Sequence, residues 1–141
     1  MLLDANLLLY AVDSRSPHNP TAAEWLEATM NGDQRVGLAW QTLGAFLRIS
    51  THPRIWPNPL SARDAWAYVE AWLAADPVWI PPTSEHTASV LRRLIERHHI
   101  TGNLVPDAQL AALAIENGLE LLSADTDFAR FKELRWRNPL A

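Results

Sequence analysis

The sequence predicts an α/β protein in which helices cover both faces of a short, mostly parallel sheet, giving three α/β/α layers. Short apolar segments typical of buried strands alternate along the chain with longer segments whose apolar residues recur at helical spacing. This alternation indicates parallel strands, because each parallel pair needs a long crossover connection. The chain has 141 residues and no internal repeat, so we expect one domain covering residues 1–141.

The first elements are a strand and two helices. Residues 1–3 form an apolar strand, and residues 6–12 are apolar on too many faces for a surface helix, which predicts a helix enclosed in the core. After a proline-containing break, Thr21 and Glu24 have the spacing of a capping box. A helix is therefore expected to begin at Thr21 and to end at about residue 31.

The middle of the chain continues the same order. Residues 36–39 predict a second strand, and residues 42–51 predict a helix that ends before a proline. Three prolines make residues 53–59 a loop. Ser61 and the acid three residues later predict the start of the next helix, and residues 78–80 predict a strand that a pair of prolines ends.

The last third supplies two more helices and a strand. Apolar spacing predicts helices over residues 85–98 and 106–117, the second with a proline in its first turn and a glycine just beyond its end. Residues 119–123 predict a strand, and a short helical piece is expected around residues 128–131.

Composition restricts the classes of function. The chain is 48% hydrophobic and 20% charged, which is ordinary for a globular protein, and it contains no cysteine for disulfides or thiolate chemistry. It shows no signal peptide and no long apolar run, so we expect no membrane association and a cytoplasmic location. The net charge of −4 does not indicate nucleic-acid binding, but clustered metal-binding carboxylates would themselves lower the net charge.

Three aspartates stand at the ends of expected elements. Asp4 follows the first strand, Asp107 opens a helix, and Asp125 follows the last strand. Loops beyond the strand ends of an α/β sheet are neighbours in space, so these carboxylates can meet. Hard oxygen ligands of this kind suit Mg²⁺, with Mn²⁺ as a second possibility. An alternative for Asp107 and for nearby Asp127 is simple stabilisation of a helix N-terminus.

Three stretches of the sequence resemble the signature motifs of PIN-domain proteins, specifically the VapC toxins of bacterial toxin–antitoxin modules. They are MLLDAN at residues 1–6, NLVPDA at residues 103–108 and LSADTDF at residues 122–128, and the resemblance extends over the whole chain. It implies a Mg²⁺-dependent endoribonuclease that cuts structured RNA, often tRNA or ribosomal RNA. It also implies neutralisation by a VapB antitoxin, contact with operator DNA only through that antitoxin, and a homodimer.

The resemblance gives individual residues expected roles. Asp4, Asp107 and Asp125 match three of the family's acids and are the expected catalytic residues. The same three, together with Asp127, are the expected metal ligands. Polar residues in supporting positions are Asn6, Gln41 and Thr42, and the basic residues that could contact RNA phosphates are Arg15, Arg48, Arg54 and Lys132.

One position departs from the family pattern. Many members carry a glutamate in an E-x-x-R arrangement on the third helix, whereas this chain has Ala45 three residues before Arg48. Either this subgroup works with the remaining acids, or Ala45 is an inactivating substitution. A catalytically weakened module that acts by binding its antitoxin is therefore a second hypothesis.

A third hypothesis is a phosphatase or phosphotransfer domain. That chemistry needs a second aspartate two residues after the nucleophilic one, and this chain has Asn6 there. Aromatic residues concentrate between residues 53 and 79, which suggests a dimer surface, and Trp56 in the proline-rich loop is a candidate for contact with a base or an antitoxin.

Overall fold

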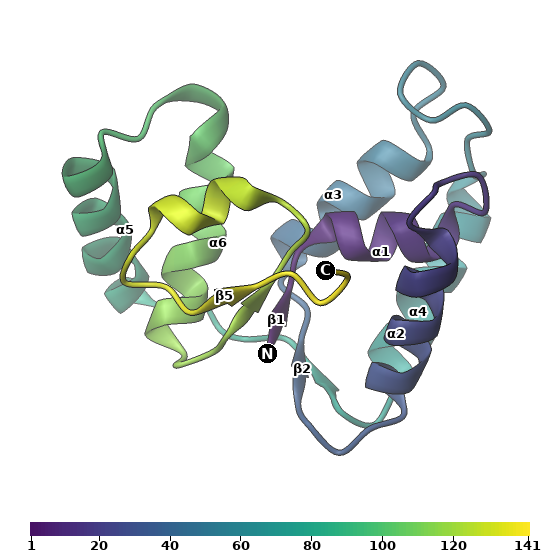
Figure 1. Cartoon of the computed structure of the whole chain (residues 1–141), viewed down its shortest axis with the longest axis horizontal. Coiled ribbons are helices and arrows are strands. Elements are labelled where there is room, and N and C mark those ends of the chain that lie inside the picture. The colour runs from purple at the N-terminus through teal and green to yellow at the C-terminus, as the bar shows by residue number, and fades with distance from the viewer.

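Five short parallel strands form the central sheet of the computed structural model, which describes residues 1–141 (Figure 1). The strands are β1 (Leu2–Leu3), β2 (Val36–Gly37), β3 (Val78–Trp79), β4 (Leu121–Leu122) and β5 (Trp136–Arg137). They lie in the order β3-β2-β1-β4-β5, and every neighbouring pair is parallel. The expected α/β class with a parallel sheet is confirmed. The edge strand β5 was not expected; Trp136 and Arg137 are not buried, and the segment lacks the short apolar run that marks the other strands.

Helices cover both faces of this sheet. They are α1 (Ala5–Val12), α2 (Asn19–Met30), α3 (Trp40–Ser50), α4 (Ala62–Ala74), α5 (Glu85–His98) and α6 (Val105–Glu116), with 3₁₀ turns η1 (Gly102–Leu104) and η2 (Thr126–Arg130). Leu3 and Leu122 belong to the core cluster formed with α1 to α4, whereas Leu2 and Leu121 belong to the cluster formed with α5, α6 and η2. Successive strand residues therefore face opposite layers, as the period of a strand requires.

Two of the expected helix starts can be compared directly with the structure. The Ser61 hydroxyl accepts a hydrogen bond from the Asp64 N–H at the start of α4, so that expected cap is confirmed. The capping box expected at Thr21 is wrong, because α2 already begins at Asn19. Pro20 favours the first helical turn, and the Asn19 side-chain amide donates to two carbonyls at the end of α1.

The strand order creates an opening at one edge of the sheet. The chain leaves central β1 toward β2 and β3, then returns to place β4 on the other side of β1. Connections that leave neighbouring strands in opposite directions open a crevice beyond the carboxyl ends of those strands. Asp4 follows β1 and Ser123 follows β4, so both stand at this crevice. None of the helices combines the length and apolarity needed to cross a bilayer.

Candidate metal centre

Asp4 caps helix α1 at the carboxyl end of β1. One carboxylate oxygen accepts the Ala5 N–H at 2.8 Å, and the other accepts the Ser123 hydroxyl at 2.7 Å and the Asn6 side-chain amide at 3.2 Å. The residue thus serves both as a helix cap and as part of a polar network. These contacts fix the Asp4 carboxylate at the crevice.

Ser123 is the centre of this network. It is fully buried, and besides donating to Asp4 it accepts the Asn6 amide at 3.0 Å and the Asp125 backbone N–H at 3.0 Å. One hydroxyl therefore links the acid after β1 to the acid after β4. Sequence reasoning missed this role; the available signal was a hydroxyl residue directly between an apolar strand and an acidic turn.

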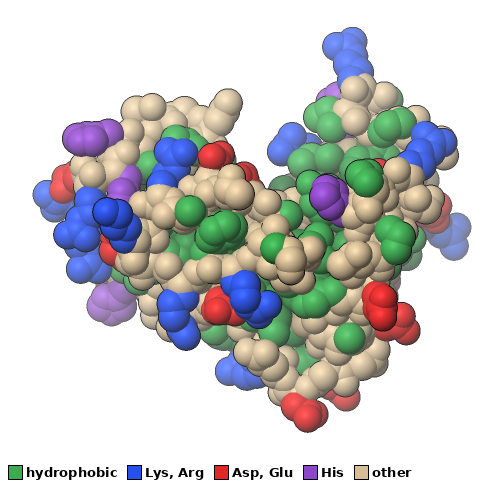
Figure 2. Space-filling view, viewed as in Figure 1, with side chains coloured by type: hydrophobic (Ala, Val, Ile, Leu, Met, Phe, Trp, Pro, Cys, Tyr) green, Lys and Arg blue, Asp and Glu red, His purple; other side chains and the backbone are tan.

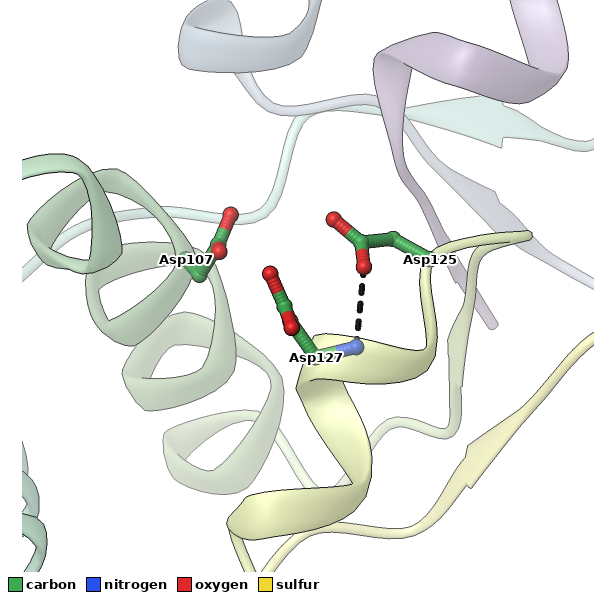
Figure 3. Close-up of side chains that lie close together, drawn as sticks. All are labelled: Asp107, Asp125 and Asp127. Carbon is green, nitrogen blue, oxygen red and sulfur yellow. Dashed lines mark hydrogen bonds between the residues drawn. The ribbon is translucent and has the colours of Figure 1, made fainter.

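Three carboxylates converge beside the network (Figure 3). Asp107 projects from the first turn of α6, and Asp125 and Asp127 project from the start of η2. Each offers an oxygen, and these oxygens all lie within 4.8 Å of one another. The Asp125 carboxylate also accepts the Asp127 N–H at 2.8 Å, which holds the turn that brings both acids forward. Asp4 is not one of the three residues in this cluster.

The electrostatics show that the acids repel one another. Burial, and then the charges of Asp125, Asp4 and Asp127, together raise the pKa of Asp107 to about 6, against an opposing effect from Arg130. The pKa of Asp4 is raised by burial and, to a smaller extent, by Asp125, although the hydrogen bond from Ser123 lowers it. Asp4 is therefore electrostatically part of the site although it lies outside the three-residue cluster.

A hollow of about 450 Å³ adjoins these residues and is formed by α1, α3 and α6. Asp4, Asn6 and Asp107 line it, and so do Ala45 and Arg48 on α3. Figure 2 shows the surface notched between the α1–α3 side and the α6 side, with acidic side chains on the α6 side. Ala45 thus faces the site from the position where the family pattern has glutamate.

The supporting residues expected from the sequence make structural hydrogen bonds. The Gln41 amide donates to the Pro106 carbonyl at 2.7 Å, which ties α3 to the residue before Asp107. The buried Thr42 hydroxyl donates to the Leu3 carbonyl at 3.0 Å and so braces α3 against β1. Both residues line the hollow, but the Thr42 hydroxyl proton is already used within the fold.

Only one of the four expected RNA-contacting residues lines this hollow. Arg48 does so from α3, whereas Arg15, Arg54 and Lys132 are exposed residues outside its lining. Arg130 was not expected; its guanidinium donates to the Asp127 carbonyl at 3.0 Å and lies 3.5 Å from the Asp127 carboxylate. This arginine partly offsets the negative charge of the cluster.

A comparison with known protein families agrees with this fold and arrangement of acids. The PIN domain model matches residues 1–134, and the chain belongs to the PIN-domain family. The similarity is more specific at the level of whole sequences. The chain is 43% identical over 141 residues to ribonuclease VapC37 of Mycobacterium tuberculosis, covering 99% of this chain and 97% of that protein. It is 41% identical over 137 residues to ribonuclease VapC33 of the same species, covering 97% and 96%. Within the PIN family it is therefore a member of the VapC ribonucleases.

Solved structures show the same fold at lower sequence identity. VapBC-1 from nontypeable Haemophilus influenzae aligns with a TM-score of 0.68 and 15% identity, covering 99% of this chain and 98% of that one. Mycobacterium tuberculosis VapC20, a toxin that cleaves the sarcin–ricin loop, aligns with a TM-score of 0.68 and 17% identity, covering 95% and 98%. At these identities the likeness concerns the fold.

Proposed function

We propose that this chain is a Mg²⁺-dependent endoribonuclease toxin that hydrolyses phosphodiester bonds in structured RNA such as tRNA or ribosomal RNA. The observation that carries the proposal is the group of three carboxylates, Asp107, Asp125 and Asp127, with oxygens within 4.8 Å of one another. The ribonuclease names of VapC37 and VapC33 supply the reaction class. VapC20 cleaves the sarcin–ricin loop, which supports a folded RNA as the substrate.

The donor set fits a hard divalent cation. All the candidate ligands are carboxylate oxygens, which Mg²⁺ and Mn²⁺ prefer, and the pKa of Asp107 is raised by burial and then by the neighbouring carboxylates, whose charges a cation would offset. Asp107, Asp125 and Asp127 would hold the ion, and Asp4 would act beside them. A bound ion would supply Lewis-acid chemistry, by polarising a phosphate oxygen and lowering the pKa of a coordinated water.

The chain's own groups supply positioning and proton transfer. Asp4, which lies outside the three-carboxylate cluster, would position or deprotonate an attacking water. Ser123 and Asn6 hold the Asp4 carboxylate in place so that it can orient that water. Arg48, on the wall of the hollow, is placed to contact a phosphate of the bound RNA.

A VapB-type antitoxin is the proposed partner. Solved neighbours of this fold are VapBC complexes, and the VapBC2 complex from Rickettsia felis is bound to a DNA fragment from its promoter, with a TM-score of 0.67 and 16% identity covering 97% of this chain and 96% of that one. Operator DNA would be reached through the antitoxin, as the promoter-bound VapBC2 complex suggests. A cytoplasmic location, where RNA and antitoxin meet, belongs to the same proposal.

A homodimer through the region between residues 53 and 79 is also proposed. Three large apolar side chains are unusually exposed there, namely Ile55 at 51%, Trp66 at 45% and Tyr68 at 40%. Exposed apolar groups in one region are typical of an interaction surface. Sedimentation of the protein without antitoxin should give a dimer at micromolar concentration, and a monomer would contradict this part of the proposal.

One observation favours a weaker enzyme as a second candidate. Ala45 lines the acidic hollow and leaves α3 without a carboxylate there. A chain with reduced hydrolysis could still act by binding antitoxin. Its sequence motifs and fold would be unchanged.

The direct test is cleavage of purified tRNA and ribosomal RNA. We expect discrete cleavage products with Mg²⁺, none with EDTA, and none with an Asp125→Asn variant that remains folded. Discrete cleavage that persists in EDTA would contradict metal dependence. Absence of cleavage by the native chain, combined with tight antitoxin binding, would favour the second candidate.

A further inference from the structure

A second hollow lies along the same edge of the sheet, next to the acidic one. It measures about 620 Å³ and is bounded by the start of α3, the segment after β3, and helices α5 and α6. Gln41 and Gln109 line both hollows, so the two are adjacent. The acidic hollow includes Asp4, which follows β1, and the second hollow includes residues that follow β2 and β3, the next strands in the sheet.

The walls of the second hollow differ in chemistry from those of the first. None of its 13 lining residues carries a charge. Trp40, the first residue of α3, is 54% exposed at this hollow, and Ile80 is 37% exposed. These are two of the five large apolar side chains that the fold leaves on its surface. The fold therefore keeps an aromatic surface uncovered beside an acidic centre.

The polar side chains of the second hollow are all neutral, and two of them, the amides of Gln41 and Gln109, also line the acidic hollow. The Gln41 Nε2 group donates one hydrogen bond to the Pro106 carbonyl, which leaves its second N–H and its amide oxygen without a partner in the protein. The Gln109 amide makes no hydrogen bond within the protein and keeps both a donor and an acceptor. Amides of this kind can pair with the edges of nucleic-acid bases.

We propose that this hollow is a nucleobase subsite, in which Trp40 stacks on an unpaired base next to the cleaved phosphodiester bond while Gln109 reads the edge of that base. The inference rests on the proposed ribonuclease function and adds a source of sequence preference to it. A phosphate held at the acidic hollow would place its neighbouring nucleotide near the second hollow, because Gln41 and Gln109 line both. Single-stranded RNA is generally recognised by stacking on aromatic side chains together with hydrogen bonds to base edges.

A base fits these walls better than the other possible occupants. A phosphate would find no cation there, because every lining residue is uncharged. A second copy of the chain or an antitoxin segment could cover Trp40, but neither explains why this aromatic surface lies next to the acidic hollow. These two occupants are outcomes that the test below can distinguish.

The test compares three variants at one position: Trp40→Phe, Trp40→Leu and Trp40→Ala. Each is assayed in the full chain with Mg²⁺ on RNA oligonucleotides that carry all four bases at the positions flanking the cut. We expect Trp40→Ala and Trp40→Leu to lower kcat/KM by at least about tenfold and to flatten the base preference at one flanking position. Trp40→Phe should retain most of the rate, because stacking needs an aromatic ring rather than apolar bulk. Gln109→Leu should change the base preference with a smaller loss of rate.

A second measurement uses no catalysis. The indole N–H signal of Trp40 is assigned in a nuclear magnetic resonance spectrum with Trp40→Phe, and a single-stranded RNA of about ten nucleotides is added in EDTA. We expect the Trp40 signal to shift with the RNA concentration. If no RNA is cleaved but this signal shifts, the hydrolytic function fails while the subsite stands.

Several outcomes would overturn the subsite. An unchanged rate and base preference in Trp40→Ala would do so, and so would an unshifted Trp40 signal with added RNA. Loss of the dimer in Trp40→Ala with base preference intact would assign the hollow to a second copy. Loss of antitoxin neutralisation with cleavage intact would assign it to the antitoxin.

Discussion

The Ser123 hydroxyl donates a 2.7 Å hydrogen bond to the Asp4 carboxylate, although the two residues are 119 positions apart in the chain. The same oxygen accepts the backbone N–H of Asp125 at 3.0 Å. A single buried hydroxyl thus sets the relative position of the acids that follow β1 and β4. Its removal should therefore affect the acidic centre as a whole.

We expect Ser123→Ala to lower kcat by about 10- to 100-fold, the usual cost of losing a group that orients metal-binding residues. The free energy of unfolding should fall by about 1–3 kcal/mol, because the buried partners lose a hydrogen bond. Ser50→Ala is the matched control, since Ser50 is equally buried and its hydroxyl has no hydrogen-bond partner. Steady-state cleavage and urea unfolding measure both quantities. Equal behaviour of the two variants would refute the positioning role.

Metal affinity should depend on pH through Asp107. Its pKa of about 6 means that the carboxyl is largely protonated below that pH, and protons then compete with a cation for its oxygens. Mn²⁺ affinity measured by calorimetry should fall as the pH drops from 7 to 5. In Asp107→Asn the affinity should be low and this part of the pH dependence should be lost. A native affinity that is flat over this range would contradict Asp107 as a ligand.

The stability of the metal-free protein should change with pH in a defined direction. Because the pKa of Asp107 is raised from 3.8 to about 6, the folded state binds a proton that the unfolded state releases between these values. The free energy of unfolding contributed by this group therefore falls as the pH rises from about 4 to about 6, and the loss persists at pH 7.

Asp107→Asn removes this unfavourable charge. We expect it to raise the melting temperature of the metal-free protein at pH 7 by about 2–5 °C. As a control, Glu70→Gln at an exposed position on α4 should leave the melting temperature nearly unchanged. A lower melting temperature for Asp107→Asn would mean that the three acids are not in repulsive contact.

Restoring an acid on α3 should strengthen the site. Ala45 lines the acidic hollow, so Ala45→Glu places a carboxylate where the family pattern has one. We expect tighter Mg²⁺ binding and cleavage faster by at least about tenfold. Ala45→Gln controls for bulk, and Gly44→Glu controls for charge, because Gly44 has open space around it and does not line the hollow. No gain in either quantity would show that this subgroup works without the fourth acid.

Arg48 should contribute a phosphate contact. Arg48→Ala is expected to weaken RNA binding at low salt and to reduce the slope of log affinity against log salt by about 1. Arg63→Ala changes an exposed arginine in the first turn of α4 that does not line the hollow and is the control. An equal salt slope for the native chain and Arg48→Ala would remove Arg48 from the RNA path.

The location of the acidic centre could be predicted because each acid directly follows or opens a regular element. The short strands fix where Asp4 and Asp125 emerge, and the parallel arrangement brings those ends to one edge. Which aspartates share the closest contact could not be predicted. That depends on η2, where Asp125 accepts the Asp127 N–H at 2.8 Å and turns Asp127 toward Asp107. Sequence spacing does not determine such a turn.

Other details depended on contacts between distant segments. The start of α2 was placed two residues late because the bonds from Asn19 to the end of α1 are tertiary, whereas the Thr21 and Glu24 spacing is local. Ser123 carried no motif of its own, and its importance appears only once β4 lies beside β1. Hydrogen bonds across a sheet cannot be read from one segment alone.

The central position of β1 in the sheet has a consequence for folding during synthesis. The Leu2 N–H donates to the Glu120 carbonyl at 2.8 Å, and β1 pairs with β4. The N-terminal strand β1 can therefore pair with β4 only after most of the chain has been synthesised. Contacts between such distant residues form slowly, because a long loop must close before they are gained. A growing chain that still lacks residues 121–127 has neither β4 nor two of the three clustered carboxylates. A partial product that ends before Asp127 therefore lacks the complete carboxylate cluster.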